Sequence, residues 1–229
     1  MTTNHPTAVI DLRALKAALH AVSPSETRYY LAGVCVEISP SSVTYVATDG
    51  YILFAAHREA PKGEDNTLTG TWIIPHALIK AVKLGRKLGE TATLALSPIG
   101  GELLLQQDGA PGVSFKPVEG TFPDWRRVVP GASAGASGQW EPLTPDRLIK
   151  SGNEVNQFDP ALLARLQRAG QDLEMGKVPY VHHPEPGNPS VVTWPGYRDA
   201  LGVIMPVRVT DDPWAAPTWV TSTSALKAA

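Results

Sequence analysis

The stretch VIDLRALKAALHAV, residues 9–22, decides how the rest of this chain is interpreted. Its first residues are β-branched and typical of a strand, and Asp11 is then well placed to cap the N-terminus of a helix. The apolar side chains that follow share one helix face: Leu12, Leu15, Leu19 and Val22. A strand that runs directly into an amphipathic helix predicts a unit in which the helix packs against a sheet.

Two later stretches have the same arrangement, WIIPHALIKAVKLGRKLG at 72–89 and NQFDPALLARLQRAG at 156–170. In the last of them, Asp159 suits the N-cap and Pro160 the first helical turn. Short apolar stretches bounded by turn residues follow each helix, which is the pattern of strands. These strand candidates are 29–39, 42–48, 51–59, 92–98, 101–107, 112–120, 178–183, 190–196 and 200–209. The sequence therefore predicts an α+β fold of repeated β-α-β-β-β units, with helices on one face of antiparallel sheets.

A small, uncharged segment, GASAGASG at 131–138, has the composition of a linker. It predicts a complete first domain at 1–130 with two repeats, and a shortened second domain at 131–209 with one recognisable repeat. The tail at 210–229 combines tryptophans and prolines without a clear period. We expect this tail to be irregular, or to dock on the protein over a pocket or a sheet edge.

The composition is that of a globular protein with a substantial core, since 43% of the residues are hydrophobic and 18% are charged. The first residues lack the basic and apolar regions of a signal peptide, and no apolar run is long enough to span a membrane. The single cysteine, Cys35, excludes a disulfide within the chain and fits a reducing cytoplasm. Because Cys35 lies in the apolar run LAGVCVEI, we expect a small buried side chain, with a nucleophile as the alternative.

Positive charge is concentrated in the three predicted helices. The chain has 20 Lys and Arg against 22 Asp and Glu, yet no acid lies within 12–22, 76–88 or 160–170. The cations on the three helix faces are Arg13, Lys16 and His20; Lys80, Lys83, Arg86 and Lys87; and Arg165 and Arg168. These helices hold 8 of the 20 Lys and Arg, so the remainder of the chain is strongly acidic, with 12 cations against 22 anions.

Basic faces without acids, on equivalent helices, are what a sequence-independent phosphate-binding surface requires, because duplex DNA is held through its backbone charge. The acidic remainder of the chain disfavours non-specific contacts elsewhere. We therefore predict that these basic faces bind DNA. The alternative is that the Lys and Arg side chains simply solvate exposed helices.

Four motifs follow one another along the chain: TRYYLAGVCVEI (27–38), TYVATDGYILFAA (44–56), FPDWRRVVP (122–130) and VIMPVRV (203–209). With these motifs the chain resembles the bacterial sliding clamp, the beta subunit of DNA polymerase III. Residues 8–130 resemble the clamp's middle domain along its full length, and residues 156–209 resemble the second half of its C-terminal domain. The resemblance implies the DNA-clamp fold.

The resemblance further implies a non-enzymatic processivity factor that encircles or grips duplex DNA and tethers DNA polymerase and other clamp-binding proteins. In that family helices line the hole of the ring, so the basic helix faces here would meet DNA. Tyr29 and Tyr30 lie on a segment that approaches DNA in clamps; alternatively, one of them begins a strand and packs. No cofactor is expected.

The family also has a pocket between its middle and C-terminal domains, where partners insert a short, partly hydrophobic peptide. Carried over by motif, this pocket comprises Leu31, Thr48, Gly50, Leu53, Pro130, Val203, Met205, Pro206, Val207 and Arg208. A flexible Met in an apolar cleft suits varied aliphatic and aromatic anchors. Apart from the resemblance, these are ordinary core and strand-end residues.

The chain departs from the clamp pattern in three ways. The usual N-terminal domain is not matched, so a six-domain ring needs a homo-trimer, which is our first expectation. Only about 25 residues, 131–155, stand where a helix and several strands normally precede the last repeat. Tyr51 and Ile52 replace the His-Arg that usually follows TDG, which removes a cation at the pocket rim and predicts an altered peptide preference.

These departures leave a second function open. It is a non-encircling, clamp-derived interaction module, of the kind a phage or mobile element carries, that binds replication proteins or clamp-binding peptides.

Other chemistry has little support in the sequence. His182 and His183 are neighbours on a predicted strand, so they point to opposite faces and are unfavourable ligands for one metal. Asp49 in ATDG suits a turn better than a catalytic role. The sequence has no phosphate-binding loop, nucleophile elbow or paired helical His motif, and we expect no enzyme.

Overall fold

The computed structural model describes residues 5–23, 26–63, 65–84, 90–97, 100–130, 157–176, 178–182 and 187–207. Several sequence predictions concern residues outside these ranges: Arg86, Lys87, His183, Arg208, the linker at 131–138 and the tail at 210–229.

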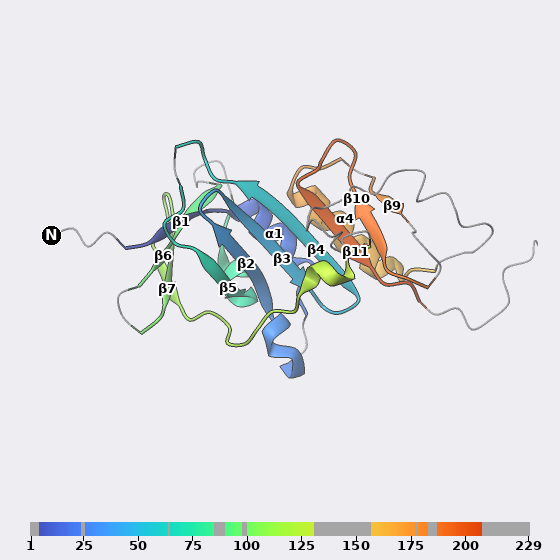
Figure 1. Ribbon diagram of the computed structural model, residues 1–229, viewed down its shortest axis with the longest axis horizontal. Helices are drawn as coiled ribbons and strands as arrows, with labels where there is room; N and C mark the ends of the chain where they lie inside the picture. Colours follow the sequence, from blue (N-terminus) through green and yellow to red (C-terminus); the bar gives the residue numbers. More distant parts are fainter. Residues whose placement is uncertain are drawn as a thin grey trace, which may run out of the picture.

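Antiparallel strands form the frame of the molecule (Figure 1). They are β1 (Thr7–Asp11), β2 (Gly33–Ser39), β3 (Ser42–Thr48), β4 (Ile52–Glu59), β5 (Gly70–Pro75), β6 (Thr91–Leu96), β7 (Leu103–Gln107), β8 (Val113–Phe115), β9 (Tyr180–His182), β10 (Ser190–Thr193) and β11 (Ala200–Ile204). A smaller sheet has the order β1-β6-β7-β8, and a larger one the order β5-β2-β3-β4-β11-β10-β9.

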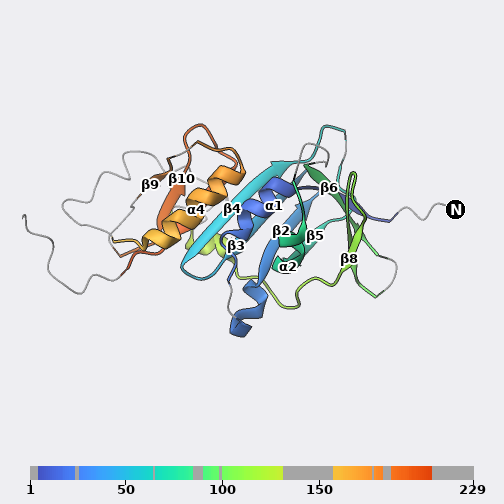
Figure 2. The same cartoon turned by 180° about the vertical axis from the view of Figure 1, so that it is seen from behind.

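The α-helices lie side by side on one face of these sheets (Figure 2). In the described part of the chain they are α1 (Leu12–Leu19), α2 (His76–Ala81) and α4 (Pro160–Asp172). Two short 3-10 segments, η1 (Glu26–Leu31) and η2 (Trp125–Val128), complete the elements. The α+β fold predicted from the sequence, with helices on one face of antiparallel sheets, is confirmed.

The predicted starts of the first and third helices are also confirmed. The Asp11 carboxylate accepts hydrogen bonds from two backbone N–H groups in the first turn of α1, at 2.8 and 3.0 Å. Asp159 accepts one from the backbone of Ala161 (2.8 Å), and Pro160 occupies the first helical position. Each cap satisfies N–H groups that have no partner inside the helix, and so fixes where the helix begins.

The second helix is shorter than predicted. We expected it to run through 76–88, but α2 ends earlier and Val82 has extended backbone angles (φ −62°, ψ 129°). Beyond it, the Gln107 side chain donates a hydrogen bond to the Lys83 carbonyl (3.0 Å), which ties the chain to β7. A β-branched residue at this point also favours helix less than its neighbours do. The prediction that Lys80 and Lys83 share a helix face is therefore wrong.

The larger sheet is buried on both faces around β2, β3 and β4. Alternate side chains enter different hydrophobic clusters: in β4, Ile52 and Phe54 face the cluster under the helices, whereas Leu53 and Ala55 face the cluster on the opposite side. Trp125 of η2 covers this second cluster. Burial on both faces explains why these strands read in the sequence as continuous apolar runs.

Cys35 is 1% exposed and belongs to the second cluster, as the apolar run around it predicted. Burial raises the pKa of its thiol to about 12, because desolvation disfavours the thiolate. A thiol that remains protonated at neutral pH is a poor nucleophile. Cys35 therefore serves as a small hydrophobic side chain.

The larger sheet joins segments that are far apart in the sequence. β4 pairs with β11, with Ile52 opposite Ile204 and Leu53 opposite Val203. Strands β2 to β5 come from the unit predicted at 1–130, and strands β9 to β11 from the unit predicted at 131–209. One continuous sheet therefore holds the two parts together (Figure 1).

None of the helices that the structure describes is long and apolar enough to cross a membrane. Within the described ranges, His, Cys, Asp and Glu side chains do not gather into groups of three that could hold a metal ion. His182 instead lies with its Nε2 2.7 Å from the hydroxyl of Thr193 on the neighbouring strand.

A glycine allows α4 to approach β10 closely. A Cβ added at Gly170 would lie 2.3 Å from Nε1 of Trp194, and this indole is almost fully buried. We expect Gly170→Ala to lower the free energy of unfolding by about 1–3 kcal/mol through overpacking, although Ala favours helix over Gly. Chemical denaturation measures this. Gly176→Ala is the control because nothing lies within 4 Å of its added Cβ; a Gly170→Ala variant as stable as this control would contradict the prediction.

Candidate functional site

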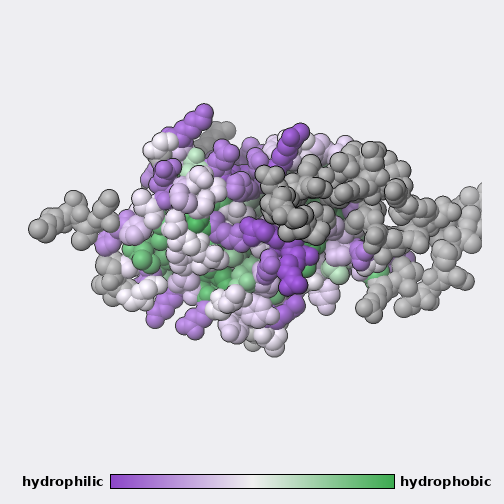
Figure 3. Space-filling view, in the orientation of Figure 1, coloured by the Kyte–Doolittle hydropathy of each residue, from purple (hydrophilic) through white to green (hydrophobic). Residues whose placement is uncertain are grey.

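An apolar pocket of about 180 Å³ opens where β4 begins and β11 ends. It lies on the sheet face opposite the helices, where η2, drawn in yellow-green in Figure 1, crosses in front of the sheet. Its lining residues are Leu31, Thr48, Gly50, Tyr51, Ile52, Leu53, Pro123, Asp124, Trp125, Val128, Val203 and Met205. On the same face, apolar patches lie beside a band of strongly hydrophilic residues (Figure 3).

The turn between β3 and β4 forms one side of the pocket. One carboxylate oxygen of Asp49 accepts hydrogen bonds from the backbone N–H groups of Tyr51 (2.8 Å) and Ile52 (2.9 Å). Gly50 has φ +92°, a conformation that other residues rarely adopt. A Cβ at Gly50 would also lie 2.6 Å from a guanidinium nitrogen of Arg28, so this arginine covers the turn. The turn predicted for ATDG is present and shapes the pocket rim.

Another side of the pocket is the η2 segment, which Glu37 holds in place. The Glu37 carboxylate accepts hydrogen bonds from Nε1 of Trp125 (2.9 Å) and from both Nη atoms of Arg126 (3.0 and 2.6 Å). The Arg126 guanidinium also lies 4.3 Å from the centre of the Trp125 ring. Burial by itself raises the pKa of Glu37, but the hydrogen bonds from Arg126 and Trp125 outweigh it, and the pKa is lowered.

The structure brings together six of the residues that the resemblance assigned to this pocket: Leu31, Thr48, Gly50, Leu53, Val203 and Met205. Pro130, Pro206 and Val207 are not among the residues that line this cavity. The Met205 N–H bonds to the Tyr51 carbonyl at 2.8 Å, but the Val207 N–H bonds to Gln157 at 2.7 Å. The chain therefore leaves the pocket after Met205.

Half of the lining was absent from the pocket residues assigned from the sequence: Tyr51, Ile52, Pro123, Asp124, Trp125 and Val128. Of these, Tyr51 and Ile52 had been placed at the pocket rim. The other four lie in the FPDWRRVVP motif, from which only Pro130 was assigned to the pocket. Tyr51 is 61% exposed and Val128 is 47% exposed. Large apolar side chains that remain exposed beside a cavity indicate a binding surface, and only the folded structure reveals them.

The helix face on the other side of the sheet carries less free positive charge than the sequence predicted. Arg13 of α1 pairs with Glu90 (2.6 Å) and with Glu174 (2.5 Å), and hydrogen bonds to these two carboxylates raise its pKa. His20 lies with its Nε2 2.8 Å from a carboxylate oxygen of Asp172. The prediction of helix faces free of acids is therefore wrong for α1, because acids from other segments reach its cations.

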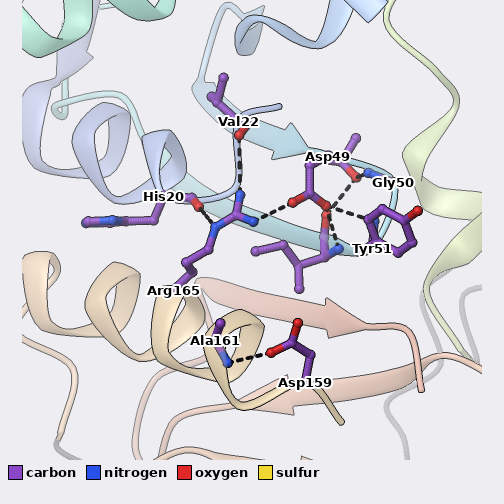
Figure 4. Close-up of polar contacts among 10 residues, drawn as sticks. His20, Val22, Asp49, Gly50, Tyr51, Asp159, Ala161 and Arg165 are labelled. Atoms are coloured by element: carbon purple, nitrogen blue, oxygen red, sulfur yellow. Dashed lines mark hydrogen bonds and ion pairs between the residues drawn. The ribbon is translucent and has the colours of Figure 1, made fainter. Parts of the chain in front are cut away.

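Arg165 of α4 is half-buried, and each nitrogen of its guanidinium makes a contact within the protein (Figure 4). Its guanidinium pairs with Asp49 at 2.5 Å and donates hydrogen bonds to the backbone carbonyls of His20 (2.8 Å) and Val22 (3.3 Å). The prediction that Arg165 faces DNA is corrected. Its neighbour in the predicted face, Arg168, is exposed on α4.

The remaining predicted cations within the described ranges are Lys16 on α1, Lys80 on α2, Lys83 beyond α2, and Arg168. Lys80, Lys83 and Arg168 are exposed and Lys16 is half-buried, and none has an acidic partner among the described residues. Because α1 packs between α2 and α4, these side chains come from one face of the molecule (Figure 2).

Tyr29 and Tyr30 lie in η1 rather than at the start of a strand. Tyr29 is 56% exposed, whereas Tyr30 packs against the second hydrophobic cluster. The two rings meet edge to face, with centroids 5.8 Å apart. Of the pair, Tyr29 is the one that presents a ring to solvent.

Two antiparallel sheets with helices on one face, and a pocket where two parts of a continuous sheet meet, define the fold of a DNA clamp. The structure of the DNA polymerase sliding clamp from Bacillus subtilis matches with a TM-score of 0.65 and 17% identity, over 91% of this chain and 66% of that chain. A sliding clamp from Bartonella birtlesii bound to griselimycin matches with a TM-score of 0.59 and 21% identity, over 91% and 68%.

Residues 11–124 match the central domain of the DNA polymerase III beta subunit family. The beta sliding clamp of Caulobacter vibrioides is 33% identical over 127 residues, which are 54% of this chain and 33% of that protein. The chain is thus a divergent member of the DNA polymerase III beta subunit family. Its sequence match spans only about a third of the length of this curated relative.

The Glu37 cluster gives the fold a dependence on pH. Because the folded pKa of Glu37 lies below the ordinary value of 4.5, its hydrogen bonds stabilise the protein above that pH and are lost as the pH falls through the folded pKa. We expect Glu37→Gln to be less stable than wild type at pH 7 by about 1 kcal/mol, and the difference to shrink below pH 4.5. Denaturation across this range measures it, with the exposed Glu59→Gln as control; parallel curves for wild type and Glu37→Gln would refute the assignment.

Proposed function

We propose that this chain is a non-catalytic, clamp-type tethering protein that holds a short, partly apolar peptide of a replication protein in the pocket at the start of β4 and the end of β11. The observation that carries the proposal is the pocket itself. Segments far apart in the sequence build it, and ion pairs and hydrogen bonds hold two of its sides in place.

The size and lining of the pocket favour a peptide anchor over a whole small molecule. Its volume of about 180 Å³ is below the roughly 300–1,000 Å³ of typical small-molecule sites, and close to a cavity of about 150 Å³ that accepts one benzene ring. One large apolar side chain therefore fills it. Met205 and Tyr51 at the opening can adapt to different anchors.

The rim chemistry narrows the peptide further. Tyr51 and Ile52 supply no cation where the family usually has His-Arg, but Arg28 covers Gly50 at the same turn. An acidic group beside the apolar anchor of the peptide would complement this arginine. We therefore infer a preference for peptides that carry a carboxylate next to a bulky apolar residue.

A compound bound by a clamp of the same fold suggests a second probe. The Bartonella birtlesii clamp with the same fold has been solved bound to griselimycin. We infer that griselimycin and a clamp-binding peptide compete for the pocket in this chain.

A second role, a sequence-independent grip on duplex DNA, is favoured by three exposed cations: Lys80 of α2, Lys83 beyond α2 and Arg168 of α4. Arg13, His20 and Arg165 are occupied by acids, so the grip of one chain is weaker than the sequence implies. A homo-oligomer, with a trimer as the first expectation, would bring several such faces around one duplex. In the described structure β8 and β9 end their sheets, and such edges are surfaces on which another copy can pair.

The peptide proposal predicts that shortening Met205 weakens binding. The probe is a fluorescein-labelled hexapeptide with an Asp next to a Leu-Phe pair, and fluorescence polarisation measures its Kd. We expect Met205→Ala to raise the Kd about tenfold, because one lost anchor contact is worth about 1.4 kcal/mol. Val178→Ala is a matched control, since Val178 is 70% exposed and does not line the pocket. An equal Kd for wild type and Met205→Ala would exclude the pocket as the binding site.

The DNA proposal predicts salt-sensitive binding through α2 and α4. The double variant Lys80→Glu, Arg168→Glu should lose most of its affinity for duplex DNA at 50 mM salt and should reduce the slope of log K against log salt by about two. Lys62→Glu, in an exposed turn, is the control. Affinity that survives the double variant would contradict the basic helix face. Retention on circular but not on linearised DNA would separate encirclement from a non-encircling module.

A further inference from the structure

Arg165 connects three segments that are separate in the sequence. From α4 its guanidinium reaches the carboxylate of Asp49 on the β3–β4 turn (2.5 Å). It also reaches the carbonyl of His20, the C-cap of α1 (2.8 Å), and that of Val22 just beyond (3.3 Å). Figure 4 shows these contacts converging on a single side chain. The carbonyls at the C-terminal end of a helix carry partial negative charge, so they too favour a cation.

Asp49 needs this partner because it is buried. The residue is only 5% exposed, and a buried carboxylate without a cation is strongly destabilising. Arg165 is the cation that pairs with Asp49 in the described structure. The bond therefore fixes the orientation of the carboxylate as well as its charge.

The orientation of Asp49 determines the shape of the pocket rim. The oxygen that does not face Arg165 accepts the N–H groups of Tyr51 and Ile52, and both of these residues line the pocket. The Tyr51 carbonyl in turn accepts the N–H of Met205 at the end of β11. A continuous path of hydrogen bonds thus runs from α4 to two sides of the pocket.

We propose that Arg165 is a positioning residue of the peptide pocket: from α4 it holds Asp49, and through Asp49 the rim turn 48–52, in the conformation that accepts the peptide. The proposal rests on the peptide-binding function proposed above. Arg165 touches the peptide nowhere; it acts by keeping the rim in one conformation before binding, so that binding does not have to order it.

The experiment compares variants that change Arg165 to different extents. Arg165→Met removes all its hydrogen bonds, whereas Arg165→Lys keeps a charge near Asp49 but cannot donate to three acceptors in the same planar geometry. Arg168→Met is the matched control, since it removes an exposed arginine one turn along the same helix. Calorimetry with the Asp-Leu-Phe hexapeptide gives the Kd and the stoichiometry at a temperature where circular dichroism shows every variant to be folded.

We expect Arg165→Met to raise the Kd about tenfold at unchanged stoichiometry, Arg165→Lys to give a smaller increase, and Arg168→Met to give none. Adding Asp49→Asn to Arg165→Met should raise the Kd by less than the product of the two single effects, because both changes break the same bond. A purely structural role would lower the melting temperature and the bound fraction without changing the Kd, and that result would overturn the proposal.

A second measurement does not depend on the peptide. Hydrogen exchange at the amides of Tyr51 and Ile52 should be faster in Arg165→Met than in wild type, while exchange in β6 and β7 is unchanged. Unchanged exchange at the two rim amides would overturn the proposal. If wild type does not bind the hexapeptide but the rim amides respond, the function proposed for the pocket fails while the positioning of the turn by Arg165 stands.

Discussion

The arrangement of the site depends on the antiparallel pairing of β4 with β11. Both strands are apolar, and their pairing satisfies backbone groups that would otherwise be buried without partners. The register sets Leu53 opposite Val203, so the apolar ends of the two strands lie side by side. The β3–β4 turn and η2 then close around this apolar end, and the pocket results. The cavity is thus the end of a sheet that is buried on both faces, closed by a turn and a short 3-10 segment.

Some cations of the helices have acidic partners in the folded chain that their neighbours in the sequence do not reveal. Within its own length α1 has no acid, yet Glu90 and Glu174 reach Arg13, and Asp172 reaches His20. Such partly exposed ion pairs contribute little to stability. They do reduce the positive potential that a phosphate backbone would meet. A firm grip on DNA through the remaining cations therefore requires several copies of the chain, which links the proposed DNA role to the proposed oligomer.

Local rules predicted the local parts of this structure. The helix caps at Asp11 and Asp159 depend on residues next to them in the sequence, and the strands on the spacing of apolar residues. Both could therefore be predicted from the sequence. The α2 helix was predicted too long because the bond from Gln107 to the chain beyond it comes from a distant strand. Half of the residues that line the pocket were predicted, through the family motifs. The others come from turns and strand ends that are brought together only in the tertiary fold. Arg165 was misassigned for the same reason: its partner Asp49 is far away in the sequence.

The pair formed by Asp49 and Arg165 also shows how the fold gives a charged residue a partner that the sequence does not reveal. For the turn alone Asn or Ser would suffice at position 49, since one side-chain oxygen can accept the N–H groups of the following residues. A carboxylate adds a second oxygen and a charge, and at 5% exposure that charge requires a cation. Arg165 supplies it, and all three of its side-chain nitrogens are bonded inside the protein. Three of the five N–H groups of this guanidinium are therefore bonded within the protein. An arginine that looks like part of a DNA-binding face in the sequence is thus held by the turn at the pocket rim.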